Sequence, residues 1–299
     1  MSSPQIIIDG LAFTECPRWH DGTIWVNDMH DDRVIQMDES GKVLQNLEVP
    51  GRPGGVGWLP DGSLVVTSTI ERKVYRFVEG KREFYADLSN IGVTEHEIND
   101  MVVDAEGRCF IGEFGFDVHE WLHENAELIA QEGLGSPNLK LTEASVLCVD
   151  VDKSVTIAAS GFKFPNGGSI HPVTGEYLVG ETFGGCFSVF TKDGAKLSDR
   201  KIIDLGFAPD GNSRFDAEGA TWFSSPQEQA VHRVTPDGKT VDTITFELGV
   251  FACELGGHDG KTLFVCVAPT SDPAITVVER RGGLVAVRVD VPVAPEYGA

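Results

Sequence analysis

Four oxygen-bearing side chains occupy equivalent positions along the sequence and could together bind a metal cation. They are two carboxylates and two amides, each seven to nine residues before a turn glycine: Glu15, Asn99, Asn166 and Asp210. Oxygen ligands without histidine or cysteine suit a hard cation. The set therefore predicts one divalent metal ion; Ca²⁺ is the first choice, and Mn²⁺, Mg²⁺, Fe²⁺ or Zn²⁺ would be compatible.

The turn glycines define a repeat that would place these side chains. An acidic or small residue followed by Gly, and then by an apolar run of strand type, recurs at Gly22, Gly62, Gly107, Gly175, Gly219 and Gly260. The intervals are 40, 45, 68, 44 and 41 residues. Apart from the third, each matches one four-stranded propeller blade. The sequence predicts an all-β fold, a single six-bladed β-propeller over residues 1–299.

In a propeller, the position shared by the four side chains opens the innermost strand of a blade, beside the central channel. The other two repeats have Gly54-Gly55 and Cys253 there, which would leave one side of the axis open for a substrate. The alternative is that the Asn and Asp residues only form turns, as they commonly do next to glycine. Four matches in register favour the metal site.

The long third interval contains about 25 extra residues, and its helical periodicity from Val118 to Glu132 predicts a short helical insert at about 116–140. The segment from His119 to His123 matches H-E-x-x-H, the pattern of zinc metalloproteases. A catalytic zinc site and an incidental metal site are alternatives, but we favour an amphipathic lid helix. Phe114 and Trp121 would then lie near the channel mouth and contact substrate, or would only anchor the helix.

The segments around the four positions resemble the SMP-30/gluconolactonase/luciferin-regenerating family over essentially the full length. The similar segments are Glu15-Cys16-Pro17-Arg18-Trp19, residues 99–107, Pro165-Asn166-Gly167, Pro209-Asp210-Gly211, residues 216–222 and residues 253–257. The resemblance implies a six-bladed propeller with one catalytic divalent metal, usually a lactone hydrolase. It also implies that Glu15, Asn166 and Asp210 are metal ligands, that Asn99 meets metal or substrate, and that Asp210 is the catalytic base.

Two departures from the family pattern concern the substrate. Many sugar-lactone members have Arg two residues before the Asn at position 99, where this chain has Glu97; where they read Gly-Thr-Met, it has Gly112-Glu113-Phe114. Glu97 can accept hydrogen bonds from hydroxyls but would repel an anion. His96 beside it could shuttle protons. We therefore expect a lactone more hydrophobic than gluconolactone.

Composition narrows the function classes further. The 299 residues carry a formal net charge of −22, which disfavours nucleic acid and anionic membrane surfaces as partners. No apolar run is long enough to span a membrane, and the first residues lack the features of a secretory signal. The six cysteines are scattered without a paired motif, which favours reduced thiols and a cytoplasmic location.

The hypothesis from sequence is thus a hydrolase that opens a small-molecule lactone with metal-activated water, with Asp210 accepting the proton. Two alternatives remain open. The same metal site could support an arylesterase or phosphotriesterase, or the cation could stabilise a non-catalytic binding propeller. The oligomeric state leaves no pattern in the sequence.

Overall fold

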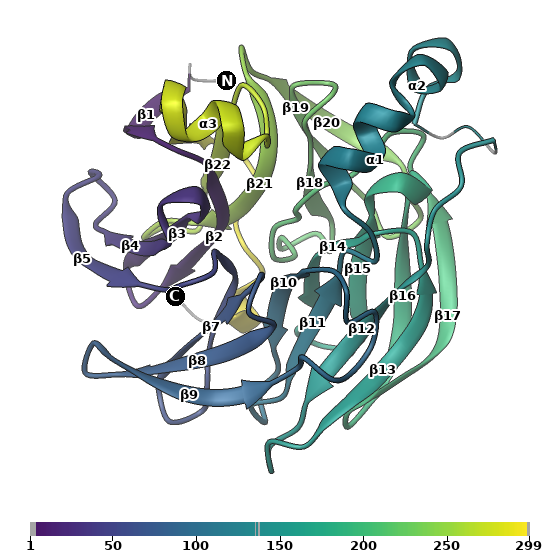
Figure 1. The fold of residues 1–299 in the computed structure, drawn as a ribbon. Helices are drawn as coiled ribbons and strands as arrows, with labels where there is room; N and C mark the ends of the chain where they lie inside the picture. Colours follow the sequence, from purple (N-terminus) through teal and green to yellow (C-terminus); the bar gives the residue numbers. More distant parts are fainter. Residues whose placement is uncertain (1–3, 135, 137, 298–299) are drawn as a thin grey trace.

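The computed structural model describes residues 4–134, 136 and 138–297. In this part of the chain, 23 strands form six antiparallel sheets. The sheets stand as blades around one axis, so the predicted six-bladed β-propeller is confirmed (Figure 1).

Consecutive strands build each blade from the channel outward. Blade 1 consists of β2 (Thr14–His20), β3 (Thr23–Asp28), β4 (Arg33–Met37) and β5 (Val43–Glu48). Blade 2 consists of β6 (Pro53–Trp58), β7 (Leu64–Ser68), β8 (Lys73–Val78) and β9 (Lys81–Asp87). Blade 3 consists of β10 (Ile98–Val103), β11 (Cys109–Glu113), β12 (Ala144–Val149) and β13 (Val155–Phe162). Blade 4 consists of β14 (Pro165–Ile170), β15 (Tyr177–Glu181), β16 (Cys186–Asp193) and β17 (Lys196–Asp204).

The last two blades differ in how their sheets are completed. Blade 5 consists of β18 (Thr221–Ser225), β19 (Ala230–Val234) and β20 (Thr240–Thr245), and an irregular segment at 210–213 pairs with β18 on the channel side. Blade 6 consists of β21 (Gly249–Gly256), β22 (Thr262–Ala268), β23 (Gly282–Arg288) and β1 (Gln5–Leu11). Because β1 pairs antiparallel with β23, the start of the chain closes the ring.

A β-bulge interrupts the innermost strand of four blades at the same step. In β2, β6, β10 and β14, three residues of the inner strand span two residues of its neighbour. The bulges begin at or next to Glu15, Asn99 and Asn166, each the second residue of its strand. A bulge re-aims the side chains beside it, which explains how these residues face the channel within a regular sheet. In blade 2 the bulge holds Gly55, where a Cβ atom would lie 2.1 Å from the backbone nitrogen of Met101.

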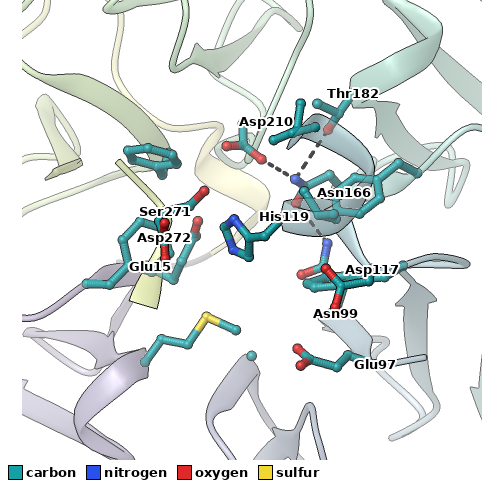
Figure 2. A pocket seen from close by; sticks show the side chains of 18 of the residues that line it. Glu15, Glu97, Asn99, Asp117, His119, Asn166, Thr182, Asp210, Ser271 and Asp272 are labelled. Atoms are coloured by element: carbon teal, nitrogen blue, oxygen red, sulfur yellow. Dashed lines mark hydrogen bonds between the residues drawn. The ribbon is translucent and has the colours of Figure 1, made fainter. Parts of the chain in front are cut away.

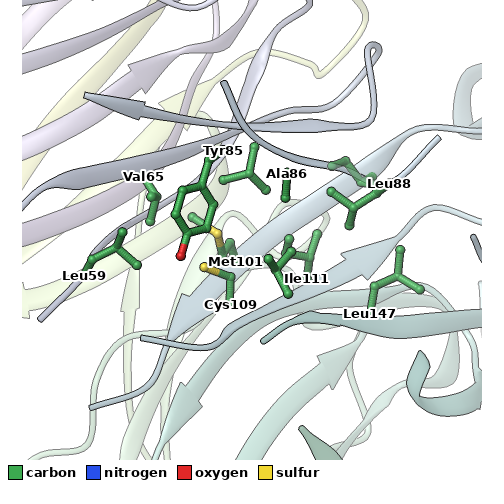
Figure 3. Packing of buried hydrophobic residues seen from close by; sticks show 12 residues of the cluster. Leu59, Val65, Tyr85, Ala86, Leu88, Met101, Cys109, Ile111 and Leu147 are labelled. Carbon is green, nitrogen blue, oxygen red and sulfur yellow. The ribbon is translucent and has the colours of Figure 1, made fainter. Parts of the chain in front are cut away.

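Apolar side chains fill the space between adjacent blades. Figure 3 shows one such cluster between blades 2 and 3, where Val65 and Tyr85 of blade 2 pack with Met101, Ile111 and Leu147 of blade 3. Each such side chain contributes about 1.5–3 kcal/mol when fully buried. Similar clusters join the other blades, so the positions of the innermost strands are fixed by packing on both sides.

Helices lie at one end of the ring. The predicted helical insert consists of α1 (Val118–Glu124) and α2 (Ala126–Glu132), between β11 and β12, and α3 (Pro273–Glu279) follows β22 (Figure 1). Three short 3₁₀ turns complete the described elements: η1 (Met29–Asp31), η2 (Thr182–Gly184) and η3 (Pro295–Tyr297). No helix in the described ranges is long and apolar enough to cross a membrane.

A buried arginine fixes the loop that leads into β10. Arg72 donates from Nη2 to Glu113 Oε1 at 2.7 Å, and both side chains are almost fully buried. The same guanidinium donates to the carbonyl oxygens of Leu88, Ile91 and His96. The loop therefore cannot move without breaking charge-assisted hydrogen bonds.

We expect Arg72→Ala to lower the free energy of unfolding by about 3–5 kcal/mol, because it leaves the Glu113 carboxylate buried without its charged partner. Urea unfolding measures this. The matched control is Arg76→Ala, which removes an arginine that pairs with Asp61 near the surface and should cost about 1 kcal/mol or less. Equal losses from the two substitutions would contradict the assignment.

Candidate active site and metal centre

A cavity of about 550 Å³ opens at the helical end of the ring. Glu15, Asn99, Asn166 and Asp210 all line it (Figure 2). They come from blades 1, 3, 4 and 5, so the structure brings together the four side chains that the repeat predicted to converge.

Hydrogen bonds join three of these side chains into a chain. Asn99 donates from Nδ2 to Asn166 Oδ1 at 3.1 Å, and Asn166 donates from Nδ2 to Asp210 Oδ1. Asn166 also approaches Thr182 Oγ1 at 3.3 Å. Each of the three residues is only 8% exposed, so this hydrogen-bonded chain of side chains forms part of the buried floor of the channel.

The floor concentrates negative charge. Burial raises the pKa of Glu15 well above its usual range, and the carboxylates of Asp210 and Asp100 raise it further. Burial likewise raises the pKa of Asp210 well above its usual range, again with a contribution from Asp100. The pKa of Asp100 is itself raised by burial, although Arg18 opposes the shift. Ionising these groups together costs free energy unless a positive charge joins them.

The donor atoms fit a hard divalent cation. Among the described residues, no protein group donates a hydrogen bond to Glu15 Oε1, Asn99 Oδ1 or Asp210 Oδ2, and the three residues line the cavity. These oxygens are therefore free to bind a ligand, and carboxylate and amide oxygens are what Ca²⁺ and similar ions prefer. In the same part of the chain, no cluster of three His, Cys, Asp or Glu side chains is close enough to hold an ion. A cation would therefore have to use the Asn amides.

The predicted substrate-binding residues divide into two groups. Glu97, His96 and Phe114 line the cavity. Trp121 is not among the described lining residues, because its ring packs behind the wall against Phe183 at 4.9 Å. Its indole nitrogen donates to the carbonyl oxygen of Lys140 at 2.9 Å. We therefore no longer expect Trp121 to contact substrate; it anchors the insert, which was the alternative raised from sequence.

The upper wall of the cavity is largely apolar. Its apolar lining comes from blade 6, the η1 turn, the insert and the start of blade 4: Phe13, Met29, Phe114, Phe116, Leu122, Leu134, Phe164, Phe183 and Phe251. Packing within this wall also holds the insert in place, since Phe116 and Phe164 both contact Phe183. The insert thus rests on an aromatic base, and its action as a lid stays a prediction.

Polar groups also line the mouth of the cavity. Glu97 lies 3.6 Å from Arg52, measured between Oε1 and Nη1, and approaches Thr69 Oγ1 at 3.4 Å. Burial raises the pKa of Glu97 despite the neighbouring guanidinium. His30 Nδ1 lies 2.6 Å from Thr276 Oγ1, and burial lowers the pKa of His30 to about 4, with further contributions from Arg52 and His119.

Several cavity residues were not identified from the sequence. Asp100 follows a predicted ligand directly, and only the bulge in β10 brings both side chains to the floor. Arg52 lies just before β6 and His30 lies just after β3, and neither occupies a position that recurs in the other blades. The residues of α3 could have been anticipated, because Asp272-Pro273 is a common helix start, and Asp272 Oδ1 does accept from the backbone nitrogen of Ala274 at 2.8 Å.

The H-E-x-x-H segment does not form a zinc site in this structure. It lies on α1 as predicted, and both histidines are exposed; His119 lines the cavity, and His123 is not part of the described lining. Among the described residues, no cluster of three His, Cys, Asp or Glu side chains that could hold a metal ion includes them.

Comparisons with known proteins agree with this architecture. Residues 13–269 match the family described as the SMP-30/Gluconolactonase/LRE-like region. A search of curated protein sequences found no match. Among solved structures, regucalcin from Agrobacterium tumefaciens, described as a calcium-binding protein, has a TM-score of 0.74 at 18% identity, covering 97% of this chain and 95% of that chain.

Two further solved structures are similar to a comparable degree. A luciferin-regenerating enzyme has a TM-score of 0.75 at 16% identity, with 97% of each chain covered. A gluconolactonase from Xanthomonas campestris has a TM-score of 0.72 at 20% identity, covering 96% of this chain and 89% of that chain. At these identities the likeness establishes the shared fold.

The raised pKa values make stability depend on pH. Without metal, Glu15 and Asp210 bind protons more tightly in the folded than in the unfolded protein, so the stability they contribute is fully present below their ordinary pKa values of 4.5 and 3.8. It is lost as pH rises through the raised values. In chelator, we expect Asp210→Asn to raise the free energy of unfolding by about 1–4 kcal/mol at about pH 8, as measured in urea.

The control for this experiment is Asp193→Asn, which removes one negative charge from an exposed strand of blade 4. It should leave the pH dependence of stability unchanged. Added Ca²⁺ should remove the advantage of the Asp210 variant. If the free energy of unfolding of both variants depends on pH in chelator as that of the wild type does, the ionised floor carboxylates do not lower stability as proposed.

Proposed function

The chain belongs to the SMP-30/gluconolactonase/LRE-like family, and from this premise we propose that it is a hydrolase that opens a lactone with the help of a divalent cation. Ca²⁺ is our first choice of ion. The observation that carries the proposal is the buried floor, where acidic and amide oxygens without protein partners line a cavity large enough for a small molecule.

The residues that would hold the cation are Glu15, Asn166 and Asp210, with Asn99 beside them. When bound there, a divalent cation supplies Lewis acidity toward a carbonyl oxygen and increases the acidity of water. The amide chain from Asn99 through Asn166 fixes Asp210 by a bond to Oδ1, which leaves Oδ2 directed at the cavity.

Asp210 would accept a proton from the attacking water. Its Oδ2 receives no hydrogen bond among the described residues, so the lone pairs are available. A cation bound beside it would favour the ionised form of the carboxyl group, which is the form that can accept a proton. Asn99 Oδ1 and the neighbouring wall would orient the ring of the substrate.

The walls support a lactone with an alkyl or aryl substituent. Aromatic and aliphatic side chains line one side of the cavity, among them Phe164, Phe183 and Leu122. Glu97, held near Arg52, stands where many sugar-lactone members of the family have an arginine, and it disfavours anionic substrates. An apolar substituent placed against the aromatic wall would gain about 25 cal/mol for each Å² removed from water.

The remaining expectations fit this proposal. A net charge of −22 disfavours nucleic acid and anionic membranes as partners. All six cysteines are free and buried, which supports the proposed cytoplasmic location.

The experiment is proton release from sugar, alkyl and aryl lactones, first in chelator and then with Ca²⁺, Mn²⁺ or Zn²⁺ restored. We expect hydrolysis only with metal, and higher kcat/KM for alkyl or aryl lactones than for gluconolactone. Asp210→Ala should reduce kcat by about 1,000-fold or more, because it removes both a ligand and the base.

Other outcomes would point to the alternatives. Higher kcat/KM on acyclic aryl esters or phosphotriesters than on any lactone would indicate an esterase. A folded, metal-binding protein without any hydrolysis would indicate a binding propeller. Metal-independent hydrolysis, or full activity of Asp210→Ala, would contradict the mechanism.

A further inference from the structure

α1 presents a histidine to the cavity from a well-anchored position. Its N-cap is Asp117, whose Oδ1 accepts from the backbone nitrogen of Glu120 at 2.9 Å. On its buried side, Trp121 packs against Phe116 and Phe183 with ring centroids 5.4 and 4.9 Å apart. His119 lies between these two fixed points and lines the cavity, and Figure 2 shows its imidazole projecting into it.

The imidazole faces the same cavity as the floor. His119 shares this cavity with Glu97, which precedes blade 3, and with His30, which follows β3 of blade 1. Asp210 lines the same cavity from blade 5. A lactone bound in the cavity would therefore be flanked by the floor and by the wall that carries His119.

Ring opening needs a proton donor as well as a base. When the C–O bond of an alkyl lactone breaks, the ring oxygen leaves as an alkoxide, which is a strong base and a poor leaving group without protonation. Arg52 holds its protons too tightly to give one up. Burial is the main cause that lowers the pKa of His30 to about 4, and its Nδ1 lies 2.6 Å from Thr276 Oγ1. His30 is therefore a poor proton donor near neutral pH.

We propose that His119 is the general acid of the reaction and donates its ring N–H proton to the departing ring oxygen. This rests on the proposed lactonase function. Water adds to the carbonyl carbon as Asp210 takes its proton; the C–O ring bond then breaks, its electron pair stays on the ring oxygen, and His119 protonates that oxygen. Asp210 returns its proton to His119 through water, so lactone and water yield one hydroxy acid.

The charged and titratable groups that share the cavity mouth with His119 belong to five segments. They are His30 of η1, Arg52 before β6, Glu95, His96 and Glu97 before β10, Asp117 at the start of α1, and Asp272 at the start of α3. His96 is the competing donor among them, and the test must separate the two histidines.

The test compares leaving groups. δ-Valerolactone releases an alkoxide, whereas dihydrocoumarin releases a phenolate, whose conjugate acid has a pKa of about 10 and needs little protonation. We expect His119→Asn to lower kcat by about 100- to 10,000-fold on δ-valerolactone, and by less than about 10-fold on dihydrocoumarin. The matched control is His123→Asn, on the same helix and equally exposed but not among the described cavity-lining residues, which should retain both activities.

Each other result would overturn the assignment. Equal losses of His119→Asn on both lactones would mean that the residue only positions substrate, and no loss would remove it from the reaction. A selective loss in His96→Asn instead would make His96 the donor. Thermal unfolding checks that all three variants keep the wild-type fold. If the wild-type protein hydrolyses no lactone, the proposed function fails first, and the role of His119 fails with it.

Discussion

The repulsion among buried carboxylates at the channel floor is the interaction on which the rest of the structure depends. Burial raises the pKa of Glu15, Asp100 and Asp210; Asp210 and Asp100 raise that of Glu15 further, and Asp100 raises that of Asp210 further. No local segment could hold such a group together, because each residue belongs to a different blade. The free energy that keeps them in place comes from the apolar packing between blades and from closure of the ring by β1.

The fold separates this strained floor from the parts that select a substrate. Bulges in the innermost strands aim polar side chains into the channel while the outer strands stay regular. The walls are made by connections between strands: the insert with α1 and α2, the loop held by Arg72, and the segment that leads to α3. Changes in these connections can therefore alter the walls of the cavity without disturbing the four side chains of the floor.

The parts of the protein that repeat could be predicted from the sequence. The turn glycines recur with nearly constant spacing, so both the number of blades and the equivalence of Glu15, Asn99, Asn166 and Asp210 followed from counting. The helical insert was predictable because its apolar positions have a helical period. Glu97 and Phe114 were singled out because the chain departs there from the family pattern, and His96 because it lies next to Glu97.

Features that occur in only one blade or loop could not be predicted from the repeat. Whether Trp121 faces the cavity or the base of the insert depends on how the helix docks on Phe183, and periodicity does not determine docking. Asp100 was overlooked because strand alternation would turn it away from Asn99, and the bulge in β10 removes that alternation. His119 was noticed only as half of a zinc motif, because nothing in the sequence shows that it shares a cavity with His30, about 90 residues earlier.

The most direct test of the central claim is calorimetric titration of the metal-free protein with Ca²⁺ in buffers of different ionisation enthalpy. The account predicts one site per chain, with protons released to the buffer near neutral pH, because the cation displaces them from Glu15 and Asp210. Asp210→Asn should bind weakly and release fewer protons. Absence of binding, or equal affinity and proton release in the variant, would contradict the claim that the channel floor is built around a divalent cation.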